Sequence, residues 1–324
     1  MTARKSVFTV LLIVVVLATL TAPSAMAAEP KKWVIGGSLM NTQEPFYLDL
    51  EQGWRDAAKD LGVDVIITSA EGDLAAQIAQ AEDFIVKKVD AMILIPADSA
   101  GIVPAVEKAN KAGIPVFTAD NNADGGKIES FIASNNYQGG VLAAEWLAKA
   151  IGEEGEVVVL GHPSITSNFQ RMQGFKETMA KKYPKVKIVQ ELETQFTRDD
   201  AIKKTEDMLV TYPNLKGIFG ATGGDAGLGA LSAVQAAGRK GIKIVNFDAI
   251  PESRKVIYDG SDILGGDAAQ FPYDIGYDSM KAAIASLRGV QVPPQMEVPV
   301  DIVTKDNLVK VGDKILVKGH EVKQ

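Results

Sequence analysis

The chain contains no cysteine and only two histidines, His162 and His320, among its 324 residues. The absence of cysteine excludes disulfide bonds, thiol catalysis and cysteine-ligated metal sites. Two histidines are too few to favour a histidine-rich zinc site or a catalytic triad centred on histidine. We therefore expect no bound metal, no other cofactor and no catalytic residue of these kinds.

Basic residues are outnumbered by acidic ones. The chain has 34 lysines and arginines against 41 aspartates and glutamates, which gives a formal net charge of −7, and no basic cluster stands out. This charge argues against nucleic acid as a partner. Hydrophobic residues make up 46% of the chain, which is enough for a large buried core. At roughly 150 residues per domain, the length predicts two domains.

The one long hydrophobic run lies at the N-terminus. Arg4 and Lys5 precede the apolar stretch 7–20, and small residues follow at Ala25 and Ala27. This pattern is typical of a secretory signal peptide, here residues 1–27, and the run is too short for a comfortable membrane span. Because no cysteine follows the expected cleavage site, we expect no lipid anchor and a mature protein that diffuses freely in the periplasm.

Strand-like and helix-like stretches alternate from Trp33 to about Leu287. This alternation predicts a parallel sheet with helices on both faces. The pattern occurs twice, because the segment 52–54 (Gln-Gly-Trp) on the first predicted helix has a counterpart at 173–175 (Gln-Gly-Phe). We therefore predict an α/β fold with two similar doubly wound halves. The tail, 305–324, has no clear assignment.

Two predicted strands, 114–119 and 242–247, are each followed directly by an aspartate, Asp120 and Asp248. In open α/β sheets, ligands bind outside the carboxyl ends of the strands. The matched pair therefore suggests two walls of one polar cleft. The alternative is that each aspartate only caps its own turn.

Short motifs along the chain resemble, in their order and spacing, the periplasmic sugar-binding proteins of the ribose-binding type. The resemblance extends from about Trp33 to Val303, which is nearly all of the expected mature chain. The motifs that carry it are Glu44-Pro45-Phe46-Tyr47, Ile114-Pro115-Val116, Asp120, Ile132-Ala133-Ser134, Asn136, Gly139-Gly140, Arg171, Gly174-Phe175, Leu228-Gly229-Ala230-Leu231, Phe247-Asp248 and Gln270.

The resemblance implies two lobes, joined by three crossover segments, that close on a small ligand. The crossovers are expected near 134–135, near Gln270 and near 294–299. The first lobe would then comprise 33–133 plus 268–295, and the second would comprise 134–267 plus 296–324.

Sugars and polyols present hydroxyl groups and apolar C–H faces, so a site for them needs charged hydrogen-bonding groups and flat aromatic walls. Asp120 and Asp248 fit as acceptors, and Arg171 fits as a donor unless it forms a surface salt bridge. Core packing is the alternative for Phe46 and Tyr47. The expected ligand-binding residues are Ser38, Phe46, Tyr47, Asp120, Asn121, Asn136, Arg171, Phe196, Thr222, Asp248 and Gln270.

Two departures from the ribose-binding pattern bear on the ligand. Asn121 follows the first aspartate, where related ribose binders usually carry arginine. The loop 221–225 (Ala-Thr-Gly-Gly-Asp) stands where they usually carry an Asn-Asp pair. Ribose, another pentose, a hexose and a linear sugar alcohol therefore all stay open. The glycine-rich segment 220–229 matches neither the dinucleotide-binding pattern nor the Walker lysine spacing.

The resemblance implies a binding protein rather than an enzyme. Its closed, ligand-bound form would be recognised by the membrane permease of an ATP-binding-cassette importer, and we expect it to act as a monomer. Two alternatives stay open. One is a secreted carbohydrate-active enzyme that uses Asp120 and Asp248 as an acid–base pair. The other is a sensory adaptor that presents the bound ligand to a chemoreceptor or a sensor kinase.

Overall fold

The computed structural model describes residues 32–195 and 197–320. The predicted signal peptide and Phe196 lie outside the described residues. From Trp33 onward, the described residues belong to one compact unit. Within it, no helix combines the length and the hydropathy that a membrane crossing needs.

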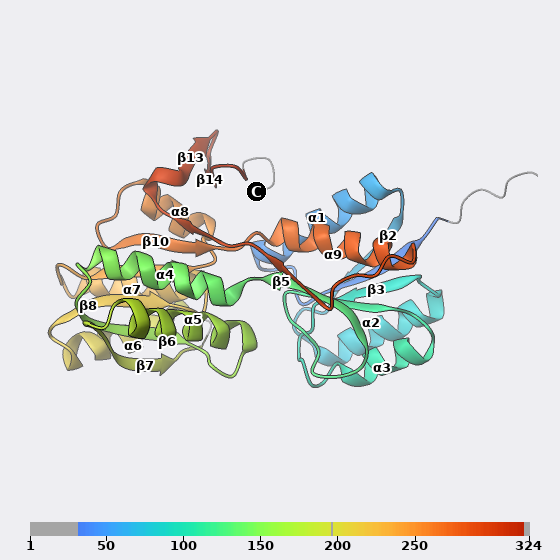
Figure 1. Cartoon of the computed structure of the whole chain (residues 1–324), viewed down its shortest axis with the longest axis horizontal. Coiled ribbons are helices and arrows are strands. Elements are labelled where there is room, and N and C mark those ends of the chain that lie inside the picture. Colours follow the sequence, from blue (N-terminus) through green and yellow to red (C-terminus); the bar gives the residue numbers. More distant parts are fainter. Residues whose placement is uncertain (1–31, 196, 321–324) are drawn as a thin grey trace, which may run out of the picture. The chain divides into compact units, whose positions relative to one another are not determined.

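Two sheets, each with six strands among the described residues, organise the chain (Figure 1). All strands of the first sheet run parallel, in the order β11-β5-β4-β3-β1-β2. With the helices packed on it, this sheet forms the first lobe. Its elements are β1 (Val34–Leu39), α1 (Pro45–Leu61), β2 (Asp64–Ser69), α2 (Leu74–Lys87), β3 (Ala91–Leu94), α3 (Val103–Lys111), β4 (Val116–Ala119), β5 (Ile128–Ser134), α9 (Pro272–Leu287) and β11 (Gln295–Val298).

The second sheet repeats this arrangement in the order β12-β10-β9-β8-β6-β7. Its one difference in direction, within the described residues, is the edge strand β12, which runs antiparallel to β10. The elements of this second lobe are α4 (Asn136–Ala150), β6 (Gly155–Gly161), α5 (Thr166–Lys182), β7 (Val186–Glu193), α6 (Arg198–Thr211), β8 (Leu215–Gly220), α7 (Gly224–Ala236), β9 (Lys243–Phe247), α8 (Pro251–Tyr258), β10 (Leu264–Ala269) and β12 (Asp301–Val303). The predicted fold of two similar parallel-sheet lobes is confirmed.

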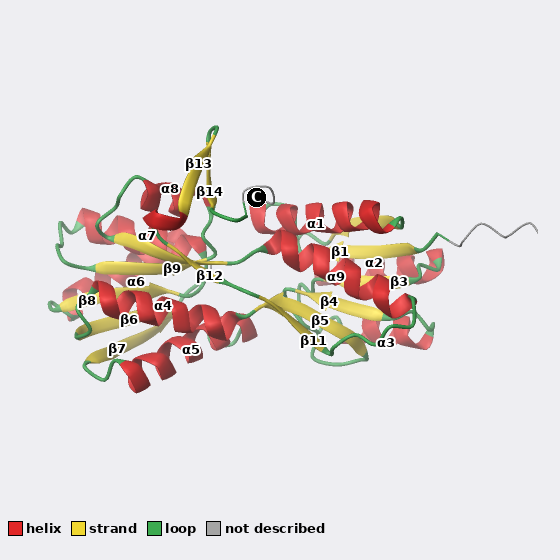
Figure 2. Cartoon of the chain, turned by 45° about the horizontal axis from the view of Figure 1, so that its top comes forward, coloured by secondary structure: helices red, strands yellow, loops and turns green. Residues whose placement is uncertain are grey.

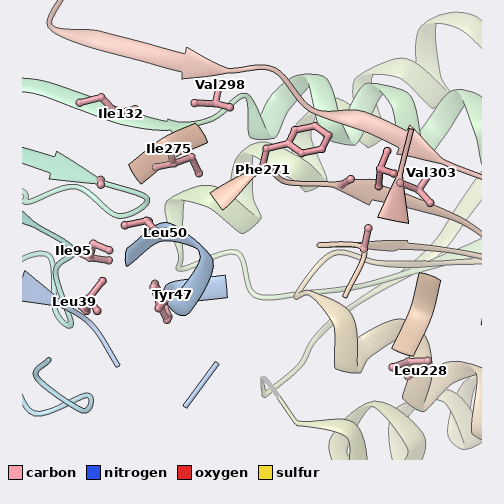
Figure 3. Close-up of a cluster of buried hydrophobic side chains, with 14 of the residues drawn as sticks. Leu39, Tyr47, Leu50, Ile95, Ile132, Leu228, Phe271, Ile275, Val298 and Val303 are labelled. Carbon is pink, nitrogen blue, oxygen red and sulfur yellow. The ribbon is translucent and has the colours of Figure 1, made fainter. Parts of the chain in front are cut away.

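Strand burial explains why these segments are almost continuously apolar. Strands β3 and β4 are buried at every residue because helices cover both faces of a parallel sheet. Figure 3 shows part of the core of the first lobe, where Tyr47 and Leu50 on α1 lie near Leu39 and Ile95. The aromatic ring of Tyr47 is therefore part of the core, as the alternative to ligand stacking proposed.

The most extensive helix pairing is that of α1 with α9 in the first lobe and of α4 with α5 in the second (Figure 1). In the second lobe, a Cβ added at Gly140 would lie 2.0 Å from the carbonyl oxygen of Arg171, and one at Gly174 would lie 2.1 Å from that of Tyr137. In the first lobe, a Cβ added at Gly53 would lie 2.2 Å from the carbonyl oxygen of Tyr273, and one at Gly276 would lie 2.1 Å from that of Leu50. Glycine is thus required where two helix backbones touch, at equivalent places in the two lobes.

Three segments connect the lobes. The first follows β5 at Asn135, the second follows β10 at Gln270, and the third is Pro299–Val300 between β11 and β12. The first and third are tied together, because the Asn135 N–H donates to the carbonyl of Val298 at 3.0 Å.

Strand pairing corrects two of the predicted lobe boundaries. Residues 296–298 belong to β11, which pairs with β5 along its whole length, so they lie in the first lobe and not in the second. Residues 268–269 belong to β10, which pairs with β9, so they lie in the second lobe and not in the first. In both cases the predicted boundary cut through a strand, because periodicity locates a short strand only to within a few residues.

The C-terminal segment forms a hairpin of β13 (Leu308–Val311) and β14 (Lys314–Val317) after a short 3₁₀ helix, Lys305–Asn307. The hairpin packs on α8 (Figure 2). Beyond it, the His320 ring stacks on Phe271 with 3.7 Å between ring centroids, and its Nδ1 lies 3.9 Å from a carboxylate oxygen of Asp274. The tail therefore connects the second lobe to the start of α9 in the first.

Candidate functional site

Asp120 and Asp248 occupy equivalent positions at the carboxyl ends of β4 and β9. The Asp120 N–H donates to the carbonyl of Ile132 on β5 at 2.9 Å, and the Asp248 N–H donates to that of Ala268 on β10 at 2.8 Å. Both aspartates have positive φ, 59° and 84°, a conformation that is unfavourable for residues other than glycine and often marks ligand sites. The duplicated fold thus places one half-buried carboxylate at the same end of each sheet.

Arg171, on α5, is buried and held by several groups. Its Nε donates to Asn136 Oδ1 at 2.8 Å, and its Nη1 donates to the carbonyl of Ala221 at 3.0 Å. Its Cζ lies 3.8 Å from the centre of the Phe247 ring, and Nη1 lies 3.5 Å from Asp248 Oδ1. The surface salt bridge considered as an alternative is therefore wrong. A guanidinium fixed in this way offers its remaining N–H groups in a set direction.

Gln270 connects the second crossover to this cluster. Its Nε2 donates to Asp248 Oδ1 at 2.6 Å. Its Oε1 is buried and has no hydrogen-bond partner within residues 32–195 and 197–320. A buried amide oxygen without a partner is costly, and a ligand hydroxyl is one group that could satisfy it.

On the first lobe, the hydroxyl of Tyr47 reaches the end of β4. It donates to Asp120 Oδ2 at 3.4 Å and lies 3.2 Å from Met40 Sδ. Asn121 Nδ2 lies 3.9 Å from the same sulfur. Phe46 is half-buried and meets the Tyr47 ring edge-on, with 5.2 Å between centroids. Tyr47 thus contributes a polar group next to Asp120, while Phe46 keeps an accessible aromatic surface.

The charged groups of the two lobes influence one another. Burial raises the pKa of Asp120 to about 6, against the opposing effect of the Arg171 guanidinium, and the negative charge of Asp248 adds to the rise. Burial, and then the charge of Asp120, raises the pKa of Tyr47 well above its usual value. Burial lowers the pKa of Arg171, whereas Asp248 and Asp120 counteract that change. Asp120 on one lobe therefore lies within electrostatic range of Arg171 and Asp248 on the other.

Two expected site residues support their neighbours instead of facing outward. Ser38 is fully buried, where its Oγ donates to Gln80 Oε1 at 2.9 Å and accepts from Gln77 Nε2 at 3.3 Å. Asn136 accepts from Arg171, and its Nδ2 donates to the carbonyl of Ser134 at 3.2 Å. Both residues hold the loops or side chains that border the site.

Thr222 lies beside the cluster in the loop between β8 and α7. Its hydroxyl shares a hydrogen bond of 3.1 Å with the Thr194 hydroxyl, so most of the Thr222 side chain is covered. Phe196, which follows Thr194 by two residues, lies outside the described residues. The role expected for Phe196 stays a prediction.

Sequence reasoning missed three residues that border this site: Met40, Thr194 and Asp267. Met40 and Thr194 each follow the end of a strand, and strand ends alone could have drawn attention to them. Asp267 is a carboxylate inside an apolar strand, β10, and is fully buried. An aspartate inside an apolar strand is unusual, because charged residues are rarely fully buried, and its position in the sequence could have drawn attention to it.

The described residues offer no cluster of side chains suited to bind a metal ion. No group of three or more histidine, aspartate or glutamate side chains there could hold a metal ion. The arrangement instead combines carboxylate acceptors, a fixed guanidinium, side-chain amides and aromatic surface. This is the chemistry that binds a neutral, hydroxyl-rich molecule.

The sequence is similar to those of known periplasmic binding proteins. The family model described as "Periplasmic binding protein domain" matches residues 35–291. The ribose import binding protein RbsB of Bacillus subtilis is 33% identical over 276 residues, covering 85% of this chain and 88% of that protein. The D-ribose/D-allose-binding protein of Pseudomonas aeruginosa is 33% identical over 300 residues, covering 87% of this chain and 92% of that protein.

Solved structures share the same fold. A periplasmic solute-binding protein of an ABC transporter from Actinobacillus succinogenes, crystallised with D-allose, matches with a TM-score of 0.77 and 29% identity. That match covers 85% of this chain and 98% of the other. A solute-binding protein from Bacillus halodurans with bound myo-inositol matches with a TM-score of 0.77 and 26% identity, covering 90% of this chain and 98% of the other.

Proposed function

This chain belongs to the periplasmic binding protein domain family, and we propose that it binds a neutral sugar or sugar alcohol between its two lobes. It delivers this ligand to the membrane permease of an ATP-binding-cassette importer. The observation that carries the proposal is the group formed by Asp120, Arg171, Asp248 and Gln270. Two carboxylates, one from each lobe, lie with a buried guanidinium and a crossover amide.

These groups suit hydroxyl recognition because they are held in place before the ligand arrives. A hydrogen bond to a charged group contributes roughly 1.5–3 kcal/mol. Asp120 and Asp248 accept from ligand hydroxyls, and Arg171 and Gln270 present donor and acceptor atoms. The proposed contact set is Phe46, Tyr47, Asp120, Asn121, Arg171, Thr222, Asp248 and Gln270, with Ser38 and Asn136 in supporting positions.

The ligand class follows from the chemistry of the site and from the relatives. Proteins similar to this chain are named for ribose and allose, and one similar solved structure holds myo-inositol. Asn121 supplies a neutral amide where a second arginine would favour ribose. We therefore propose a pentose, a hexose or a polyol, all without charge, because an anionic ligand would be repelled by the two carboxylates.

Ligand contact with both lobes stabilises the closed arrangement over the open one. The three connections at Asn135, Gln270 and Pro299 are the proposed hinge. The proposal includes action as a monomer in the periplasm, after export through a cleaved signal peptide. The alternative function, a secreted carbohydrate-active enzyme, is not supported, since the relatives named above are binding proteins. A sensory role would use the same closed form.

A thermal-shift screen over neutral pentoses, hexoses and polyols tests this function. A ligand present at 100 times its Kd adds about 2.7 kcal/mol to the free energy of unfolding, so at least one sugar is expected to raise the melting temperature by several degrees. Asp225→Ala, which removes an exposed carboxylate, is the control and should respond like the wild type. An unchanged melting temperature across the whole panel would contradict the proposal.

A further inference from the structure

Asp267 on β10 is a fully buried carboxylate that the ligand contacts proposed above do not include. Its Oδ1 accepts the N–H of Ala249 at 2.9 Å, and Asn246 Nδ2 lies 3.5 Å from its Oδ2. The Ser253 hydroxyl also hydrogen bonds to this carboxylate. Asp267 thus contacts both Asn246 at the end of β9 and Ser253 at the beginning of α8.

The segment that Asp267 holds is the loop that carries Asp248. Asp248 and Ala249 have consecutive positive φ values of 84° and 45°, which residues with a side chain adopt only when their surroundings enforce them. The hydrogen bond from Ala249 N–H to Asp267 fixes the second of these two residues. Without that acceptor, the Asp248–Ala249 backbone would relax toward ordinary conformations and its carboxylate would shift.

The same network reaches the first turn of α7 and the loop before it. Asn246 Oδ1 accepts the N–H of Gly227 at 2.9 Å, and its Nδ2 donates to the carbonyl of Gly224 at 3.1 Å. A Cβ added at Gly223 would lie 2.3 Å from Asp248 Oδ2, so the Asp248 carboxylate packs directly on this loop. The position of Asp248 therefore depends on Asn246 and Asp267 together.

The first lobe achieves the equivalent turn without a buried aspartate. By strand register, Thr118 corresponds to Asn246 and Phe131 corresponds to Asp267. After Asp120, the loop is held by Asn122, whose Oδ1 accepts from the Thr118 hydroxyl at 2.7 Å and from the Ala123 N–H at 3.0 Å. The fold alone does not require a carboxylate at this place, so Asp267 serves the Asp248–Ala249 turn in particular.

We propose that Asp267 is a positioning residue for ligand binding, which holds the Asp248–Ala249 backbone so that Asp248 meets Gln270, Arg171 and the ligand correctly. The proposal rests on the function proposed above. Asp267 itself is covered and does not contact the ligand. It acts through Asp248, because Arg171 and Gln270 both bind the same carboxylate oxygen of that residue.

A double-mutant cycle separates positioning from a general loss of structure. The probe is D-ribose or D-allose, whichever binds the wild type more tightly, and affinity is measured by titration calorimetry. Asp267→Ala is expected to weaken binding at least tenfold in the wild type. Its effect should nearly vanish in the Asp248→Asn background, where the contact it aligns is already impaired. In the Asp120→Asn background, which changes the other lobe, Asp267→Ala should still weaken binding at least tenfold.

The conservative variant supplies a second readout. Asp267→Asn keeps an oxygen for the Ala249 N–H, so its affinity should stay within about threefold of the wild type. Equal losses for Asp267→Ala in both backgrounds, or a loss in Asp267→Asn as large as in Asp267→Ala, would overturn the proposal. If Asp267→Ala does not fold, Asp267→Ser replaces it in the cycle, since its hydroxyl is too short to reach the same N–H.

A measurement without ligand keeps this inference distinct from the proposed function. Hydrogen exchange at the Ala249 amide is expected to be at least tenfold faster in Asp267→Ala or Asp267→Ser than in the wild type and in Asp267→Asn. Unchanged exchange would overturn the positioning role, whatever the protein binds. Failure of every sugar to bind the wild type, together with the expected exchange pattern, would instead contradict the proposed function.

Discussion

At the scale of single residues, the site depends on charges that are held by neighbours and not left free in solvent. Arg171 is the clearest example, because Asn136, Ala221 and the Phe247 ring fix it before any ligand binds. The energetic advantage of such a residue is that little conformational entropy is lost on binding. Its cost is that the protein also depends on it for stability.

Arg171→Ala is therefore expected to abolish sugar binding and to lower the stability of the ligand-free protein. Removing one partner of a buried ion pair costs about 3–5 kcal/mol, and the value here should be nearer 2–3 kcal/mol because Asp248 is partly exposed. Chemical denaturation with and without sugar measures both effects.

Arg198→Ala is the matched control for Arg171→Ala. Arg198 bridges Asp225 and Glu252 at 2.8 Å each, but all three side chains are substantially exposed. Its loss should cost less than about 1 kcal/mol and leave binding intact. An Arg171→Ala protein as stable as Arg198→Ala would show that the buried contacts contribute nothing.

The raised pKa of Asp120 leads us to expect that ligand affinity depends on pH. Burial raises its pKa to about 6, so the carboxylate is ionised above that pH and protonated below it. The ionised form accepts more hydrogen bonds from ligand hydroxyls, so affinity should be constant above about pH 7. Below about pH 6, affinity should fall by up to about tenfold per pH unit. Titration calorimetry from pH 4.5 to pH 8 measures this.

The same raised pKa affects folding in the opposite sense. The folded protein holds a proton on Asp120 up to about pH 6, whereas the unfolded chain releases it near pH 3.9. The contribution of this group to stability is therefore fully present below about pH 3.9 and is lost as the pH rises through 6. Asp120→Asn should remove the change centred near pH 6 from both profiles, and a wild-type affinity that is flat down to pH 4.5 would contradict the assignment.

At the scale of elements, each lobe contains a helix pair in close backbone contact, α1 with α9 in the first and α4 with α5 in the second. The pairing of α4 with α5 matters for the site because Gly140 touches the backbone of Arg171 itself. The repeat of Gln-Gly-Trp as Gln-Gly-Phe indicated the duplication in the sequence. The sequence did not show that Gly174 would lie opposite Gly140, or Gly53 opposite Gly276. The two segments that touch are far apart in the chain in each case.

Gly140→Ala should therefore destabilise the protein and weaken ligand binding together. Its new methyl would lie 2.0 Å from the Arg171 carbonyl oxygen, which forces α5 away from α4 at a cost of about 1–3 kcal/mol. The displaced Arg171 should weaken sugar binding about tenfold or more.

Gly217→Ala serves as the control for Gly140→Ala, since its Cβ would crowd the side chains of Val157 and Leu147 in the core of the same lobe. It should cost similar stability without the loss of affinity. Equal affinity losses in the two variants would argue against a specific effect on Arg171. Denaturation curves and titration calorimetry on both variants make the comparison.

Sequence patterns predicted the alternating elements, the two halves and the aspartates at the strand ends, because these features are local. They did not predict what surrounds each side chain. The sequence leaves Tyr47 as either a stacking surface or a core residue, and only the folded chain shows that its ring is buried and its hydroxyl meets Asp120. Asp267 drew no attention, since its significance lies in the Ala249 N–H, which only the folded chain brings within reach.

At the scale of the whole molecule, two similar lobes share their connections. Helices α4 and α9 each follow a crossover and pack in the lobe that the chain has just entered. The C-terminal tail adds a contact at the second of these crossovers, where His320 stacks on Phe271. The hinge therefore lies next to the site, because Gln270 both begins the second crossover and binds Asp248.

The central claim is that one neutral sugar is held by both lobes at once and leaves unchanged. Titration calorimetry with the best sugar of the screen, on the wild type, Asp120→Ala and Asp248→Ala, tests it most directly. We expect one site per chain in the wild type, loss of binding in each variant, and chemically intact sugar recovered from the calorimeter cell. Wild-type affinity in either variant, or consumption of the sugar, would contradict it.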